Sequence, residues 1–367
     1  MTVRTIQMAE IKLTEEEIAS AVRVLSSGAL RQGKECDGFE QEFAQKVGAK
    51  YAVASANGTA ALHLAYMTFL QPGDEVLVPS FTFIATGSMV SAAGGKPVFC
   101  DVDAQTFLID LDDAERKVGA NTRAIAPVHL FGNVCDIDKV ETFAEKHDLV
   151  IVWDAAQAHG ACFKGQDIGA FADFVCYSFY PSKNMFVGEG GMTCSHKPEY
   201  DYNMRYMRTH GQSDKYLHTM LGFNYRMTDV EAAIGREQLK RLDTMLIDRR
   251  RNASILNEGF EGLPGIQPQK VTPNSEHAWH QYCIVVDQEE FGLTRDQLAQ
   301  ALQERGIASG VHYPRGLHQQ PIFKELYGES ALPVTEYLSE HILAIPVHHG
   351  LSEEDVHRIV EAANSCH

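Results

Sequence analysis

Apolar side chains recur at helical spacing in several parts of this chain. Residues 13–25 show this spacing, and Thr14 followed three positions later by Glu17 is the pattern of a capping box, so a helix is predicted there. Helical spacing resumes over 39–47 and again in a long charged stretch over 229–252. These segments are predicted helices on either side of a differently patterned middle region.

The middle region alternates short apolar runs with amphipathic segments. The apolar runs are predicted strands over residues 51–54, 75–78, 97–102, 124–130, 149–153 and 174–178. The segments between them are predicted helices over residues 59–70, 84–93, 110–118 and 137–147. This alternation predicts an α/β fold with a mostly parallel central sheet and helices on both faces. Ligands of such sheets bind at the carboxyl ends of the strands.

The last third of the chain predicts a smaller α+β domain. Its candidate elements cover residues 280–286, 294–305, 310–313, 334–344 and 352–363. We therefore expect a large domain over residues 1–250 and a small domain over 251–367. Three consecutive arginines, Arg249 to Arg251, lie near the end of the charged helix and are predicted to form a solvated face.

Composition excludes several classes of function. The formal charge of −17, from 32 basic and 49 acidic residues, argues against sequence-independent binding to nucleic acid and against binding to an anionic membrane. No signal pattern and no apolar run of membrane-spanning length occurs, so a cytoplasmic protein is expected. Eight cysteines are scattered singly, which favours buried thiols over disulfides. The sixteen histidines form no recognisable ligand motif, so no metal is expected.

The first predicted strand is followed by a candidate anion site. Asn57, Gly58 and Thr59 come directly before a helix, and a helix N-terminus offers free backbone N–H groups and a positive dipole end. The alternative is an ordinary capped helix with Asn57 or Thr59 as the cap. The motif matches neither the dinucleotide fingerprint nor the Walker loop, which argues against a nicotinamide oxidoreductase.

Three other strand ends carry candidate chemistry. Phe81 and Phe83 follow the second strand, where they are either core residues or a platform for a planar ligand. Asp154 follows four apolar residues and is either a surface turn residue or a carboxylate held for a cationic ring nitrogen. Lys183 lies on a glycine-flanked turn. It is either an ordinary exposed lysine or a nucleophile, and a nucleophilic lysine needs a pKa lowered by burial or by neighbouring cations.

Asp154 and Lys183 on one sheet with an anion site match the needs of pyridoxal 5′-phosphate (PLP). This cofactor requires a lysine for its aldehyde, an acid for its pyridine nitrogen and a cradle for its phosphate.

The chain resembles the DegT/DnrJ/EryC1/StrS family of sugar aminotransferases over essentially its whole length. The resemblance is carried by six ordered motifs, at residues 57–62 (NGTAAL), 72–76 (PGDEV), 154–157 (DAAQ), 178–183 (SFYPSK), 188–192 (GEGGM) and 222–227 (GFNYRM). It implies the fold of type I PLP-dependent transferases, as in aspartate aminotransferase.

The resemblance also implies roles for individual residues. Lys183 would form the internal aldimine and shuttle the proton, and Asp154 would keep the pyridine nitrogen protonated. Gln157 would lie beside the phenolic oxygen and Phe83 would stack on the ring. The phosphate would be held by Gly58, Thr59 and Ser178, with Asn224 lent by a second subunit.

On the substrate side, the resemblance assigns Arg226 to an anionic group across the subunit interface and adds His312, Tyr313 and His318. A plain strand end in the small domain is the alternative for His312 and Tyr313. The implied enzyme is a homodimer with shared active sites. It would move an amino group from L-glutamate to the keto group of a UDP-, dTDP- or GDP-linked sugar in ping-pong order.

Three other functions are compatible with the resemblance. A cyclitol aminotransferase needs the same residues. A PLP-dependent sugar dehydratase of this family has histidine in place of the lysine, and Lys183 argues against it. A regulatory relative without catalysis would have no reason to keep Lys183, Asp154 and Gln157 together.

Overall fold

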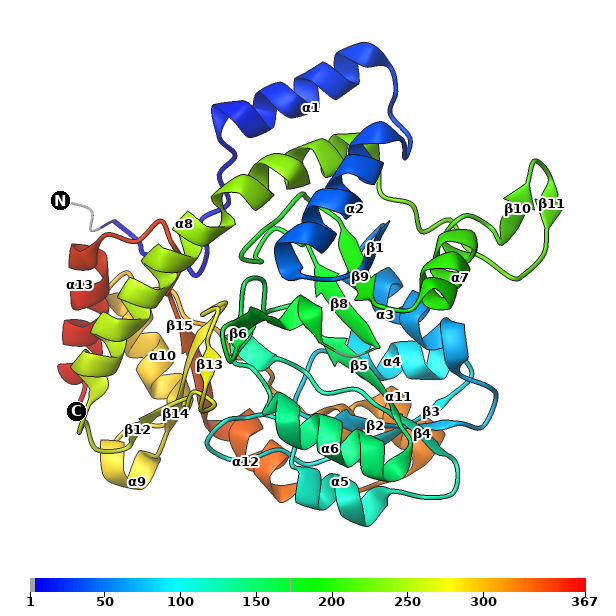
Figure 1. The fold of residues 1–367 in the computed structure, drawn as a ribbon. Helices are drawn as coiled ribbons and strands as arrows, with labels where there is room; N and C mark the ends of the chain where they lie inside the picture. Colours follow the sequence, from blue (N-terminus) through cyan, green and yellow to red (C-terminus); the bar gives the residue numbers. More distant parts are fainter. Residues whose placement is uncertain (1–3, 172) are drawn as a thin grey trace.

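The computed structural model describes residues 4–171 and 173–367. A seven-stranded sheet forms its centre (Figure 1), in the order β1-β9-β8-β5-β4-β2-β3. Its strands are β1 (Tyr51–Ser55), β2 (Glu75–Pro79), β3 (Lys96–Cys100), β4 (Thr122–Ile125), β5 (Val150–Asp154), β8 (Phe174–Ser178) and β9 (Gly191–Ser195). Neighbours pair in parallel except that β9 is antiparallel to β1 and β8. The carboxyl ends of all strands but β9 therefore meet at one edge.

Helices cover both faces of this sheet. One face packs on α3 (Gly58–Phe69), α4 (Ala85–Ala92), α7 (Pro198–Arg208) and α11 (Pro321–Tyr327). The other packs on α2 (Lys34–Val47), α5 (Leu111–Lys117), α6 (Ile137–His147) and the first half of α8 (Asp229–Phe260). Adjacent strand residues point to opposite faces, so Val152 joins the first core and Trp153 the second. Because both faces are buried, the parallel strands are almost continuously apolar.

The six strands predicted for the central sheet are all present, and one strand of that sheet was missed. β9 alternates Gly191, Thr193 and Ser195 with Met192 and Cys194, yet all five residues are buried. Because these residues are not an apolar run, the sequence pattern does not indicate a buried strand here. The strand predicted over 124–130 ends at residue 125, and α2 begins five residues earlier than expected.

The N-terminal helix α1 (Glu15–Ser27) begins with the predicted capping box. Thr14 Oγ1 accepts a hydrogen bond from Glu17 N at 3.3 Å, and Glu17 Oε2 accepts one from Thr14 N at 2.9 Å. Each contact satisfies a backbone N–H that the first turn leaves without an intrahelical partner. The helix packs along α8 (Figure 1).

A second core lies in the C-terminal part of the chain. Its antiparallel sheet has the order β12-β14-β15, with β12 (Ile266–Pro268), β14 (Tyr282–Val286) and β15 (Ile342–Ile345). The helices that pack in this core are α9 (Gln288–Phe291), α10 (Arg295–Glu304) and α13 (Glu353–Asn364), whereas α12 (Pro333–His341) packs on the first core through Leu338. Leu246 of α8 belongs to the first core and Leu256 to the second. The predicted boundary after residue 250 thus falls within a continuous helix that serves both cores, and the division into two domains stays a prediction.

The remaining elements are short. They are β6 (Cys162–Phe163), β7 (Gln166–Asp167), β10 (Gln212–Asp214), β11 (Leu217–His218), β13 (Ser275–Glu276) and the 3-10 turns at Leu130–Gly132, Ile168–Ala170 and Leu317–Gln319. All eight cysteines are free thiols, and six of them are buried, as expected. None of the helices within the described ranges is long and apolar enough to cross a membrane.

Candidate active site

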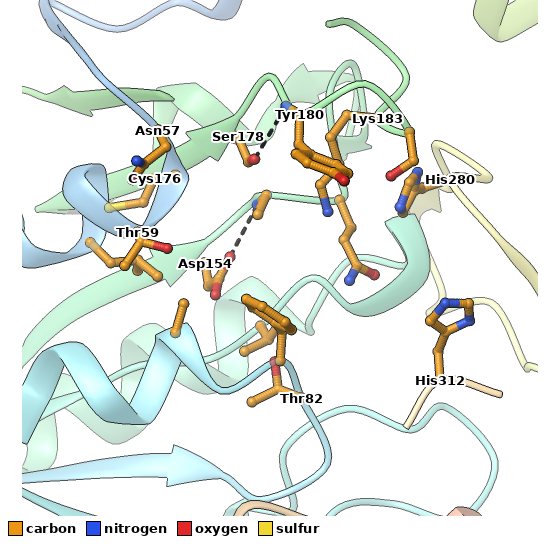
Figure 2. A pocket seen from close by; sticks show the side chains of 18 of the residues that line it. Asn57, Thr59, Thr82, Asp154, Cys176, Ser178, Tyr180, Lys183, His280 and His312 are labelled. Atoms are coloured by element: carbon orange, nitrogen blue, oxygen red, sulfur yellow. Dashed lines mark hydrogen bonds between the residues drawn. The ribbon is translucent and has the colours of Figure 1, made fainter. Parts of the chain in front are cut away.

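A cavity of about 610 Å³ opens at the carboxyl ends of β5 and β8, beside the N-terminus of α3. Figure 2 shows side chains from several elements pointing into it. Nine predicted site residues line it: Gly58, Thr59, Phe83, Asp154, Gln157, Ser178, Lys183, His312 and Tyr313. Residues more than 250 positions apart in sequence thus surround one space.

One end of the cavity is built to receive an anion. Asn57 caps α3, because its side-chain oxygen accepts a hydrogen bond from Ala60 N at 2.8 Å. That cap leaves the N–H groups of Gly58 and Thr59 at the open end of the helix. A Cβ at Gly58 would lie 2.6 Å from Ser178 Cβ, so only glycine allows this close approach. The capped-helix alternative is therefore correct for Asn57, and the cradle is compatible with it.

Asp154 ends β5 inside the protein, with only 5% of its surface exposed. Its Oδ2 accepts a hydrogen bond from Thr86 Oγ1 at 2.7 Å, and its Oδ1 accepts one from Ala156 N at 3.1 Å. Burial raises the pKa of Asp154, while these two donors and the charge of Lys183 oppose the rise. The surface-turn alternative is wrong, and Asp154 is a buried carboxylate without an ion-pair partner within 4 Å among the described residues.

Lys183 lies in the loop between β8 and β9, partly buried and facing the same cavity. Burial lowers its pKa to about 8, although the charge of Asp154 opposes that change. Within the described part of the chain its Nζ takes part in no hydrogen bond or ion pair. A substantial fraction of this amine is therefore neutral near pH 8 and available as a nucleophile.

Gln157 is held in one orientation by two contacts. Its Oε1 accepts a hydrogen bond from Phe131 N at 2.7 Å, and a backbone N–H can only donate. Its Nε2 then donates to Tyr313 Oη at 2.9 Å and keeps one further N–H free. Gln157 can therefore donate a hydrogen bond through this N–H toward a ligand in the cavity.

The two phenylalanines after β2 have different roles. Phe81 is fully buried in the core. Phe83 is 54% exposed and lines the cavity, with its ring centroid 6.3 Å from that of Tyr313. Phe83 is thus placed to cover the face of a planar ligand, and the core alternative is wrong for it.

Three predicted residues lie outside this cavity. His318 is buried between the two parts of the chain, with Nδ1 2.7 Å from Ser80 Oγ and Nε2 3.1 Å from Glu336 Oε1. It holds α12 to the end of β2 and is not in position to contact a ligand here. Asn224 and Arg226 lie in the segment between β11 and α8, away from the cavity of their own chain. Their role in a partner's site stays a prediction.

His280 is a cavity residue that the sequence did not single out. Only 8% of it is exposed, and its Nδ1 has no hydrogen-bond partner among the described residues. Burial and the nearby charge of Lys183 lower its pKa well below the usual value, so the ring is neutral. In the sequence His280 was only the first residue of a predicted strand, and no local motif marked it.

Arg249 holds the backbone of the segment that contains His280, and its position corrects a prediction. Instead of lying on a solvated face, Arg249 is 3% exposed, and its guanidinium donates to the carbonyls of Trp279 at 2.9 Å and His280 at 3.3 Å. Burial lowers its pKa to about 10. α8 continues to Phe260, so the arginines are not at its end, and Arg249 lies on the buried face of the helix with Leu246 and Ala253.

The cavity residues fit PLP by chemistry. Lys183 is the single Lys or Arg side chain among the lining residues, and it stands apart from the backbone N–H groups at α3. A phosphate would therefore be held by these N–H groups and by hydroxyls, leaving the amine free. Asp154 lies between the two ends, where a ring nitrogen could meet it (Figure 2).

The profile of the DegT/DnrJ/EryC1/StrS aminotransferase family matches residues 11–364. This chain belongs to that family. The UDP-N-acetyl-3-dehydro-α-D-glucosamine 3-aminotransferase of Acidithiobacillus ferrooxidans is 36% identical over 95% of this chain and 92% of the relative. The dTDP-3-amino-3,4,6-trideoxy-α-D-glucose transaminase of Streptomyces venezuelae is 36% identical over 96% and 92%.

Solved structures of the family share the fold. Spr1654 of Streptococcus pneumoniae, described as a PLP form, superposes with a TM-score of 0.92 at 30% identity, covering 99% of this chain and 98% of that one. The predicted fold class, a type I PLP-dependent transferase, is confirmed. The chain is an aminotransferase of this family, and the two relatives above are named as aminotransferases of nucleotide-linked sugars.

Proposed function

We propose that this aminotransferase uses PLP to move the amino group of L-glutamate to the keto group of a nucleotide-linked sugar, in ping-pong order. The observation that carries the proposal is the placement of an unpaired amine, Lys183, and a buried carboxylate, Asp154, in one cavity with an anion cradle. When bound there, PLP would supply an aldehyde carbon for amines and a ring that accepts electrons.

The cavity residues would have distinct roles toward the cofactor and the substrate. Gly58, Thr59 and Ser178 would hold the phosphate, and Phe83 would cover one face of the ring. Asp154 would hold the proton on the ring nitrogen, and Gln157 would donate a hydrogen bond to the phenolic oxygen. Once released by the amino donor, the amine of Lys183 would be free to move a proton at the substrate carbon.

The neutral groups beside Lys183 favour a sugar as acceptor. His280 and His312 both line the cavity, and for each the pKa is lowered by burial and by the charge of Lys183. Neutral imidazoles can donate and accept hydrogen bonds with hydroxyl and keto groups. The names of the two relatives contain UDP and dTDP, and both relatives are 36% identical to this chain, so the comparisons favour neither nucleotide. GDP-linked sugars stay in the proposal as a third class.

We propose a homodimer as the active form. Tyr216, Leu217 and Leu221 are exposed on and beside the hairpin of β10 and β11, as expected of an apolar interface. Asn224 and Arg226 follow in the same segment. No basic side chain in the described part of the chain itself lies at the phosphate end of the cavity, and the side-chain amide of Asn224 from a second chain would add a donor there.

Absorption spectra and a single half-reaction test this function. Purified protein reconstituted with PLP should absorb near the visible edge, and Lys183→Ala should lose that band. L-Glutamate should then convert the wild-type cofactor to its amine form with one equivalent of 2-oxoglutarate per site. Identical spectra for wild type and variant would contradict the proposal.

The alternatives predict other outcomes. Bound cofactor without any reaction with glutamate would favour a regulatory relative. Amination of a keto-inositol in preference to nucleotide keto-sugars would identify a cyclitol aminotransferase. Loss of a hydroxyl group from the sugar without amine transfer would identify a dehydratase.

A further inference from the structure

Thr86, in the first turn of α4, donates a hydrogen bond to Asp154. Its Oγ1 lies 2.7 Å from Asp154 Oδ2, and its side chain is fully buried. Thr86 does not line the cavity, so it cannot touch a ligand there. It reaches the site only through Asp154.

The single hydroxyl proton of Thr86 has two acceptors within reach. The carbonyl of Phe83 is 3.3 Å away, against 2.7 Å for the carboxylate. The shorter contact to a charged group is the stronger one, so the proton is donated to Asp154. Thr82 Oγ1, 3.3 Å from Thr86 Oγ1, is then the donor in that contact. The hydroxyls thus form a directed chain that ends on the carboxylate.

The backbone of Thr86 is held by a hydrogen bond from α3. Its carbonyl accepts a hydrogen bond from Tyr66 Oη at 3.2 Å, and Tyr66 is a fully buried residue of α3. The hydroxyl is therefore carried by two packed helices on one face of the sheet. The backbone that carries this donor is therefore held in place beside Asp154.

We propose that Thr86 is a positioning residue: its hydroxyl fixes Asp154 Oδ2 and favours the carboxylate that a protonated ring nitrogen of the cofactor needs. The proposal rests on the proposed use of PLP. The physical reason is that a buried acid tends to take up a proton, and a ring nitrogen that loses its proton to Asp154 is a poor electron acceptor. Only Thr86 and the backbone N–H of Ala156 donate to this carboxylate among the described residues.

The test replaces Thr86 by valine, which has the same shape without the hydroxyl, and by serine, which keeps it. The matched control is Thr193→Val. Thr193 is also fully buried and donates to a backbone carbonyl, that of Ala61, at 3.0 Å, but it lies outside the cavity. Each protein is loaded with PLP labelled with ¹⁵N in the ring.

Thr86→Val should move the ¹⁵N resonance toward the unprotonated pyridine position at neutral pH. It should also lower kcat with glutamate as the amino donor roughly 10- to 100-fold, with the KM for glutamate changed less than about threefold. The reason is that the lost hydrogen bond acts on the cofactor ring and not on glutamate. Thr86→Ser should restore both values. Thr193→Val should lower the melting temperature and leave both values unchanged.

A protonated ring nitrogen and wild-type kcat in Thr86→Val would overturn this proposal, whatever the loss of stability. That result would leave the proposed function intact. A wild-type protein that takes up no PLP would overturn both at once, so the two failures can be told apart.

Discussion

At the scale of single residues, the candidate site keeps a lysine in an environment that destabilises its charge. The pKa of Lys183 is about 8 in the folded chain and near 10.5 in an unfolded one. At pH 7 the amine is protonated in both states, but in the folded state it is partly buried and without a partner among the described residues. The amine that the proposed reaction needs therefore costs stability.

Lys183→Met should stabilise the protein in the absence of cofactor. At pH 7 the expected gain is about 2 kcal/mol, because methionine fills the site without burying a charge. The gain should shrink as the pH rises from 8 to 10.5. In that range the unfolded wild type binds a proton that the folded wild type does not, so wild-type stability rises with pH.

Thermal unfolding of both proteins at pH 7 and pH 9.5 measures this difference. Lys12→Met is the control, because Lys12 is exposed and its replacement should change little at either pH. A Lys183→Met variant less stable than wild type at pH 7 would show that the amine is satisfied by contacts the structure lacks.

Gln157→Glu tests the orientation of the amide. The new carboxylate can still accept from Phe131 N, but it places an acceptor where Nε2 donates to Tyr313 and, as proposed, to the phenolic oxygen. The new carboxylate and the phenolic oxygen of PLP would then be two acceptors facing each other, so the dissociation constant for PLP should rise about tenfold or more. Gln281→Glu adds the same charge elsewhere in the cavity lining and should have a smaller effect. Equal effects in equilibrium titrations would mean that charge alone, and not orientation, matters.

At the scale of elements, α8 connects the two cores and supports the cavity. Arg249 projects from it to the carbonyls of Trp279 and His280, just before β14. No carboxylate pairs with this guanidinium among the described residues, so its hydrogen bonds to the segment that carries His280 are its main compensation. The helix thereby sets the position of one cavity wall.

Arg249→Met should lower the free energy of unfolding by about 2–4 kcal/mol, because two buried carbonyls lose their donor. Arg250→Met is the matched control: Arg250 is partly exposed and pairs with Glu276 at 2.9 Å, so about 1 kcal/mol or less is expected. Thermal melting of both variants measures the difference. A loss for Arg250→Met as large as that for Arg249→Met would contradict this account.

The elements also show what the sequence can and cannot predict. The parallel strands were predictable because burial on both faces makes them continuously apolar, and Asp154 was conspicuous because it ends such a run. β9 was missed because it contains the polar residues Thr193 and Ser195, which are buried only through tertiary packing. Thr86, Arg249 and His280 have no local signature, since their importance comes from partners 30 to 70 residues away.

At the scale of the whole molecule, the cavity of one chain brings together the predicted cofactor residues with one exception. Every predicted residue of the cofactor site lines the cavity but Asn224, and the predicted substrate residue Arg226 lies with it in the segment before α8. If a partner supplies both, each site combines two chains. Mixing inactive variants then gives a result that no single-chain site allows.

Lys183→Ala disables the chain that holds the cofactor, and the double variant Asn224→Ala with Arg226→Ala disables the chain that lends residues. Subunit exchange between equal amounts should place about half of the chains in mixed dimers, each with one intact site, so about one quarter of wild-type activity should return. Lys183→Ala mixed with Asp154→Ala is the control, because both changes lie in the same cavity and no mixed dimer has an intact site. Activity in the control, or none in the test mixture after exchange is verified by mass, would argue that each chain works alone.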